Sequence, residues 1–233
     1  MTIPTARDIT VSERIVILPL GSWEQHGPHL PLHTDTVIVD AVVDAALRDT
    51  TLSATSFLRA PTLPITASDE HEGFAGGLSS GTEALVASVV AIARSASWAR
   101  GVCIVNGHGG NIPALAHISS ALEYENIPAH IWSLPSYSGG DMHAGHTETS
   151  LLLHIAPELV RHDLIEVGAT QISAEDIDLM KVSGVKAVSP NGVLGDPRQA
   201  HPDHGREVLA LYTSSLVRAL QTCITRWSIP ASQ

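Results

Sequence analysis

The chain is poor in cysteine, aromatic side chains and charge. Its 233 residues include only two cysteines, Cys103 and Cys223, which excludes both a disulfide framework and a cysteine-based zinc site. Aromatic residues make up 4% and charged residues 16% of the sequence, and 13 Lys and Arg stand against 24 Asp and Glu. The net charge of −11 leaves no polycationic surface, so we expect neither nucleic acid nor an anionic membrane as a partner.

Long apolar runs are also missing. Residues 1–14 contain no apolar core of a signal peptide, and no stretch of 18 apolar residues follows. We therefore expect a cytoplasmic protein. Hydrophobic residues still make up 44% of the chain, which is enough for a sizeable core. We expect one domain that spans residues 1–233.

Short apolar segments alternate with segments of helical periodicity. Strands are predicted at Ile15–Leu20, Leu58–Pro64, Val102–Val105 and Ala129–Trp132. Helices are predicted at Thr36–Leu47, Thr82–Trp98 (ended by Gly101), Asn111–Tyr124, Thr147–Ile155 and His204–Trp227. Residues 160–203 are predicted as loops with weak strand signals at Val185–Val188. This alternation is typical of parallel βαβ units in an α/β domain.

Histidine is abundant instead. The chain has 13 histidines, as many as Lys and Arg together, and histidine is the commonest metal ligand in proteins. The segment GSWEQHGPHLPLHTD, residues 21–35, follows the first predicted strand and holds Glu24, His26, His29, His33 and Asp35. In extended backbone Glu24 and His26 point to the same side, and this carboxylate–imidazole pair suits a first-row divalent ion. A surface loop with incidental polar residues is the alternative.

Two further segments place histidine beside glycine, and the second of them also holds a carboxylate. NGHGGN, residues 106–111, places His108 at the carboxyl end of a predicted strand, on the usual ligand side of an open α/β sheet. Its glycines could instead cradle phosphate, but the spacing and lysine of nucleotide-binding loops are missing. GGDMHAGHTETS, residues 139–150, holds His143, His146 and Glu148 before and within a predicted helix. Alternatively, Glu148 only interacts favourably with the dipole at the N-terminus of that helix.

A fourth segment, SDEHEGFAGG at residues 68–77, contains Glu70, His71 and Glu72. It is predicted either as a pocket-lining loop or as a solvated charge cluster. Taken together, independent loops that offer histidine, most of them with a carboxylate as well, predict one dinuclear metal centre, which needs about four to six such ligands.

At these residues the sequence resembles the creatininase (creatinine amidohydrolase) family, from about Ile15 to Val160. The resemblance implies a single-domain, three-layer α/β sandwich with a mostly parallel sheet flanked by helices. It also implies that Glu24, Asp35 and His108 hold one metal and that His26 and Asp35 hold a second, with Asp35 bridging the two.

Creatininase itself has a further metal-binding glutamate where this chain has Gly110. Glu148 is our candidate for the missing ligand, and it is also a candidate catalytic residue. His143 resembles the catalytic histidine of the family. His71 and His146 are expected to contact substrate or to support the ligands.

Within the family, HAGHTETSLLLHIAPE at 143–158, EHEGF at 70–74 and AVSPNGVLGDP at 187–197 are similar to a group of peptidases. That group removes a C-terminal dipeptide from a modified precursor peptide during the biosynthesis of a redox cofactor. The implied reaction is hydrolysis by a water activated between two divalent ions (Fe²⁺, Zn²⁺ or Mn²⁺), with His143 as the proton shuttle. The resemblance also implies a homo-oligomer, such as the hexamer of creatininase.

Two other functions remain open from the sequence. One is hydrolysis of a cyclic amide or a formamide, as in creatininase and other members of the family. The other is metal binding without catalysis. A serine hydrolase is disfavoured because the G-x-S-x-G match at residues 77–81 does not directly follow a predicted strand, as a nucleophile elbow does.

Overall fold

Four parallel strands form the centre of the molecule in this computed structural model, which describes residue 5 and residues 14–53 and 56–227. They are β1 (Ile15–Leu20), β2 (Phe57–Arg59), β3 (Gly101–Asn106) and β4 (Ala129–Ser133), in the order β2-β1-β3-β4. Leu20 lies opposite Asn106 in the register of β1 and β3. The loops that follow these two strands therefore leave the sheet side by side.

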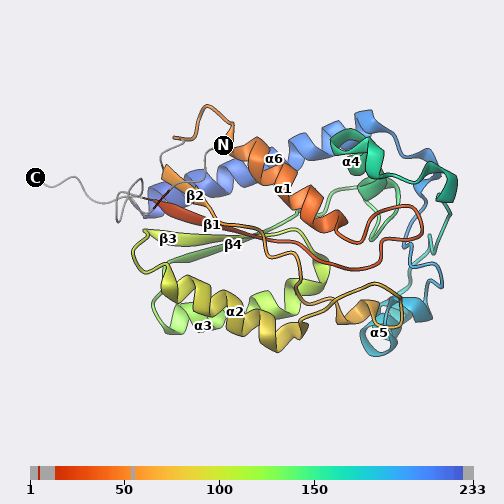
Figure 1. The fold of residues 1–233 in the computed structure, drawn as a ribbon, viewed down its shortest axis with the longest axis horizontal. Helices are drawn as coiled ribbons and strands as arrows, with labels where there is room; N and C mark the ends of the chain where they lie inside the picture. Colours follow the sequence, from red (N-terminus) through yellow and green to blue (C-terminus); the bar gives the residue numbers. More distant parts are fainter. Residues whose placement is uncertain (1–4, 6–13, 54–55, 228–233) are drawn as a thin grey trace, which may run out of the picture.

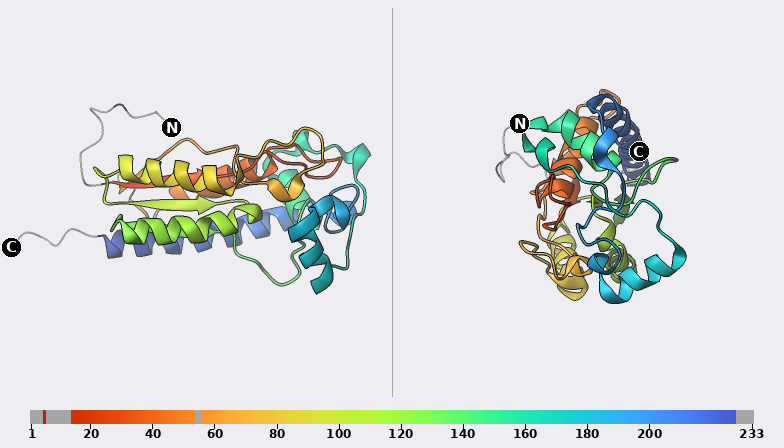
Figure 2. Two further views of the ribbon diagram at one scale, coloured as in Figure 1. Left: turned by 90° about the horizontal axis from the view of Figure 1, so that it is seen from below. Right: turned by 90° about the vertical axis from the view of Figure 1, so that its right-hand side faces the viewer.

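Helices cover both faces of the sheet (Figure 1). One face carries α1 (Thr34–Leu47), α4 (His146–Ile155) and α6 (Pro202–Arg226), and the other carries α2 (Gly81–Ser95) and α3 (Ile112–Tyr124). A sixth helix of the described residues, α5 (Ala174–Ser183), lies near one end of the molecule (Figure 2). This arrangement confirms the predicted α/β sandwich with a parallel sheet.

Two apolar cores follow from the period-two alternation of the strands. Ile15 and Ile17 of β1 pack on the side of α1, α4 and α6, whereas Val16 and Leu18 pack on the side of α2 and α3. Because both faces are covered, every residue of β1 and β3 is buried. This explains why their sequences are nearly continuous apolar runs.

Some local predictions are wrong. The second helix ends at Ser95, and Gly101 is the first residue of β3 rather than its cap; a Cβ there would approach Pro128 O and the Trp227 ring to 2.9 Å. The weak strand predicted at Val185–Val188 is instead a 3₁₀ turn, Val185–Ala187, that follows α5. The strand predicted at Leu58–Pro64 is shortened to Phe57–Arg59, because Pro61 and Pro64 cannot donate ladder hydrogen bonds.

Among the described residues, no helix has both the length and the apolar character needed to cross a membrane. The extent of the predicted domain, residues 1–233, stays a prediction because both ends of the chain lie outside the described residues.

Candidate metal centre

The side chains predicted to bind metal lie together at the carboxyl edge of the sheet. Glu24 and His26 follow β1, Asp35 is in the first turn of α1, and His108 follows β3. All four are buried, with at most 5% of their surface exposed. The loops of two neighbouring parallel strands thus bring residues 84 positions apart in the sequence into one cluster.

Asp35 lies between the two histidines. Its Oδ1 is 3.5 Å from His26 Nε2, and its Oδ2 is 3.0 Å from His108 Nδ1. Glu24 also faces both, with Oε1 3.9 Å from His26 Nε2 and Oε2 3.1 Å from His108 Nε2. Asp35 thus faces Nδ1 of His108 and Glu24 faces its Nε2, and the close ligand groups place Asp35 with Glu24 and His26.

Three buried atoms of this cluster have no hydrogen-bond partner: both carboxylate oxygens of Glu24 and Nε2 of His26. Leaving a buried carboxylate without partners is costly unless a cation neutralises it. Carboxylate oxygen and imidazole nitrogen are also the ligands that first-row divalent ions accept. The residues present therefore fit a metal.

Two more carboxylates extend the cluster in opposite directions. Glu148 Oε2 lies 3.9 Å from His26 Nε2 and 4.0 Å from His143 Nδ1. Glu70 Oε1 lies 3.3 Å from His108 Nε2. Groups of three with mutually close ligand atoms are Glu24–His26–Asp35, His26–His143–Glu148, Glu24–Glu70–His108 and Glu24–His71–His143. The cluster can thus offer ligands to two ions side by side.

Local hydrogen bonds hold the two ligand loops. Ser22 Oγ donates to Asp35 Oδ2, which fixes the side of the carboxylate that faces His108. In the second loop, Asn106 Nδ2 donates to His108 O, and Asn111 Nδ2 donates to Asn106 Oδ1. Asn111 Oδ1 in turn accepts from the backbone N–H of Ala67. These asparagines explain why NGHGGN forms a rigid turn rather than a flexible glycine loop.

The third loop places His143 and Glu148 together. Ala144 has a left-handed backbone (φ 51°) and is fully buried, and its N–H donates to Glu148 Oε2. Asp141 accepts hydrogen bonds from the N–H groups of His146 and Thr147 at the start of α4. A non-glycine residue held in this conformation is uncommon and marks a backbone constrained by its surroundings.

Protonation inside the cluster reflects the crowding of charge. Burial raises the pKa of Glu24 to about 8. Burial acts to lower the pKa of His26, but the charge of Asp35 and the hydrogen bond to it outweigh burial and raise that pKa to about 9. Burial also acts to lower the pKa of His108, but the charge of Glu24 opposes it, and the pKa of His108 is raised well above its usual value. Without a metal, protonated histidines supply the positive charge that these carboxylates need.

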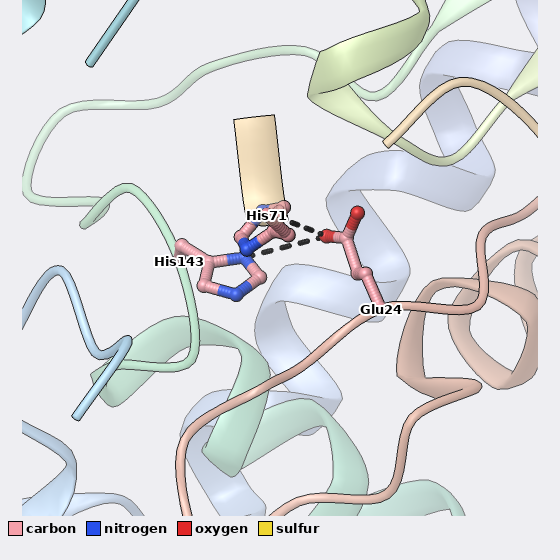
Figure 3. Close-up of side chains that lie close together, drawn as sticks. All are labelled: Glu24, His71 and His143. Carbon is pink, nitrogen blue, oxygen red and sulfur yellow. Dashed lines mark ion pairs between the residues drawn. The ribbon is translucent and has the colours of Figure 1, made fainter. Parts of the chain in front are cut away.

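Gln25 sets the tautomers of two other histidines, shown with Glu24 in Figure 3. Its side-chain amide donates to His71 Nδ1 (2.8 Å), so the neutral His71 ring carries its proton on Nε2, 3.3 Å from Glu24 Oε1. Its backbone carbonyl accepts from His143 Nε2 (2.7 Å), which leaves Nδ1 of His143 unprotonated toward Glu24 and Glu148. His71 therefore turns a protonated nitrogen toward Glu24, whereas His143 presents a lone pair to the cluster.

The remaining histidines of these segments lie apart. The ring of His146 packs against His204, with centroids 4.8 Å apart, and His146 is in none of the ligand groups found among the described residues. His29 Nε2 is hydrogen-bonded to Thr149 Oγ1, and His33 stacks on Trp23. Substrate contact by His146 stays a prediction.

Glu70 is the residue whose place in the cluster the sequence did not predict. The sequence predicts its segment, residues 68–77, either as a pocket-lining loop or as a solvated charge cluster. The buried His71 and the contact of Glu70 with His108 favour the first. The acidic sequence DEHE, residues 69–72, indicates a charged loop. Only the folded structure shows that this loop packs beside His108.

Comparison with known proteins agrees with this geometry. The family model described as creatinine amidohydrolase matches residues 1–220. A mycofactocin precursor peptide peptidase of Mycobacterium ulcerans is 44% identical over 218 residues, which cover 91% of this chain and 85% of the relative. The protein of the same name from Mycobacterium tuberculosis is 43% identical over 229 residues, covering 96% and 89%.

Solved structures of creatininase have the same fold. One creatinine amidohydrolase superposes with a TM-score of 0.76 at 20% identity, covering 93% of this chain and 92% of that one. Another, with a TM-score of 0.74 and the same identity and coverage, is a mutant creatininase of a zinc–zinc type. The match of the family model over nearly the whole length, together with relatives above 40% identity, shows that the chain belongs to the creatininase family.

Proposed function

We propose that this protein is a metal-dependent peptidase that releases a C-terminal dipeptide from a modified mycofactocin precursor peptide. The observation that carries the metal dependence is the buried pair Glu24 and Asp35, each of which faces both His26 and His108. The peptide substrate is supported by the relatives at 43–44% identity, which are named for it.

In this proposal Glu24, His26, Asp35 and His108 hold two divalent ions, with further carboxylate from Glu148. Such ions, when bound, polarise an amide carbonyl and lower the pKa of a water. The choice among Fe²⁺, Zn²⁺ and Mn²⁺ is not fixed by these ligands, because all three accept carboxylate and imidazole.

Proton transfer falls to His143. Burial and the charge of His26 lower the pKa of His143 well below its usual value, so the ring is neutral at pH 7. Its Nδ1 is unprotonated and faces the cluster, which allows it to accept a proton from water and to pass it to the departing amine. His71 Nε2 lies 3.3 Å from Glu24 Oε1 and faces the same carboxylate.

A direct assay tests the substrate. The purified protein, loaded in separate samples with Zn²⁺, Mn²⁺ or Fe²⁺, is incubated with the modified precursor peptide, with creatinine and with a formamide, and the products are identified by mass. We expect loss of the mass of a C-terminal dipeptide from the peptide, with no turnover of the two small amides. A Glu24→Gln sample prepared in parallel controls for contaminating proteases.

Each other outcome supports another function. Turnover of creatinine or of the formamide, with the peptide intact, would support a small-amide hydrolase instead. Bound metal with no turnover of any substrate would support metal binding without catalysis. The proposal also retains a cytoplasmic location and a homo-oligomer; the mass of the native protein in solution tests the latter.

A further inference from the structure

Gly110 lies beside the cluster and has no side chain, and the space next to it is taken by another residue. A Cβ built on Gly110 would overlap Glu70 Oε1 and His108 Nε2. The backbone of Gly110 is not in a conformation that requires glycine, since its φ lies outside the left-handed region. In this structure the carboxylate of Glu70 occupies the place where a side chain at position 110 would begin.

The Glu70 carboxylate is directed inward. It lies 3.3 Å from His108 Nε2, although it comes from a separate loop, the 3₁₀ turn Asp69–His71. With Glu24 and His108 it forms a group whose ligand atoms all lie within 4.8 Å of one another. The neighbouring Glu24 oxygens are buried and have no hydrogen-bond partner among the described residues, and both Glu24 Oε2 and Glu70 Oε1 face Nε2 of His108.

The segment after residue 160 holds this loop in place. Lys186 Nζ donates to Gly73 O (2.7 Å), and a Cβ at Gly184 would approach Glu70 O to 2.9 Å. Phe74 packs on the small apolar cluster of Met180, Val185 and Leu194. Such packing against α5 and the turn after it fixes where the Glu70 side chain can reach.

We propose that Glu70 is a metal ligand, which supplies a further carboxylate to the ion held by Glu24 and His108. This inference rests on the proposed function in one respect, because a ligand role for Glu70 and the proposed peptidase activity both require bound metal. It assigns Glu70 to the Glu24–His108 side of the cluster and leaves Glu148 on the side of His26.

The test is metal binding by Glu70→Gln, which keeps the shape of the side chain and removes its charge. Glu72→Gln is the matched control, because Glu72 is exposed two residues away in the same loop. Each protein is stripped with a chelator and titrated with Zn²⁺ and, separately, Mn²⁺ in competition with a chromophoric chelator. Bound metal per chain is then measured by elemental mass spectrometry after dialysis, and circular dichroism checks that each variant is folded.

We expect two ions per chain in the unmodified protein and in Glu72→Gln. In Glu70→Gln one of the two ions should bind at least about tenfold more weakly. Loss of a residue that only supports a ligand typically lowers metal affinity about 10–100-fold, and loss of a ligand should cost at least as much. Glu70→Asp, which keeps the charge on a shorter side chain, should recover part of this loss. Equal affinity and stoichiometry in Glu70→Gln and the unmodified protein would overturn the role of Glu70 and leave the proposed function intact. If the unmodified protein itself binds no metal, both proposals fail.

Discussion

Replacing Glu24 by glutamine is expected to abolish peptide hydrolysis while the protein stays folded. Glu24 faces His26, His71, His108 and His143 at once, so its loss removes a ligand shared by both ion positions. Ions contribute several kcal/mol to the stabilisation of the transition state. We therefore expect kcat/KM to fall by at least about 10³-fold, since each 1.36 kcal/mol is a factor of ten.

The fold should survive because glutamine is neutral. Burial already raises the pKa of Glu24 to about 8, which means that the charged carboxylate is disfavoured in the metal-free protein. The metal-free variant should thus melt no lower than the metal-free unmodified protein. Added metal should raise the melting temperature of the unmodified protein but not that of the variant, because only the former binds it strongly in the folded state.

Thermal melting with and without metal, together with dipeptide release, measures both effects. Glu83→Gln serves as the control, since Glu83 is an exposed carboxylate in the first turn of α2. Undiminished dipeptide release by a folded Glu24→Gln protein would show that the cluster is not the active site.

Replacing His143 by glutamine is expected to lower kcat by about 10²–10⁴-fold without loss of metal, the usual contribution of a positioned proton carrier. The glutamine amide can still donate to Gln25 O as His143 Nε2 does, so the loop is retained. It cannot take up a proton, however, and the leaving amine would depart without one.

A substrate with a different leaving group distinguishes His143 as a proton carrier from His143 as a metal ligand. A peptide analogue whose leaving group needs no proton, such as an activated ester, should be hydrolysed by His143→Gln with a much smaller deficit than the peptide. His154→Gln, an exposed histidine on α4, should behave as the unmodified protein. If His143→Gln loses an ion along with its activity, or if kcat is unchanged, the role as proton carrier is wrong.

The fold was largely predictable because its strands are buried on both faces. Ile15–Leu20 and Val102–Val105 are short apolar runs bounded by glycine or a polar loop, and only strands covered by helices on both sides need such runs. Their parallel pairing then brings the following loops to one edge. Sequence order therefore predicts that the loops carrying Glu24, His26 and His108 meet at this edge, whereas the full ligand set with Asp35 was implied by the resemblance to the creatininase family.

Within residues 160–203, which were predicted as loops, helix α5 was missed, whereas the final helix predicted at His204–Trp227 is α6 (Pro202–Arg226). Helix α5 is mostly exposed, with Met180 its only buried residue, so it has no apolar periodicity to detect. Its one sequence signal is the capping box of Ser173 and Asp176, in which each side chain bonds the backbone of the other. That pattern marks where a helix begins but not what it packs against.

The sequence predicted that His71 contacts substrate or supports the ligands, but not its tautomer or the contacts of Glu70 and Gln25. His71 is 47 residues from Glu24 in the chain, and its tautomer depends on a hydrogen bond from Gln25 that exists only in the folded protein. Glu70 gains its position because Gly110 leaves room for it. Such roles depend on tertiary contacts between loops, and no local pattern encodes them.

The most direct measurement follows dipeptide release from the modified precursor peptide as metal is removed and restored. The protein is stripped with a chelator, its metal content is verified, and ions are added back in stoichiometric steps while the cleaved peptide is quantified by mass spectrometry. Our account predicts no cleavage by the stripped protein and full recovery of the rate at two ions per chain. Cleavage at the full rate by protein that contains no metal would contradict it.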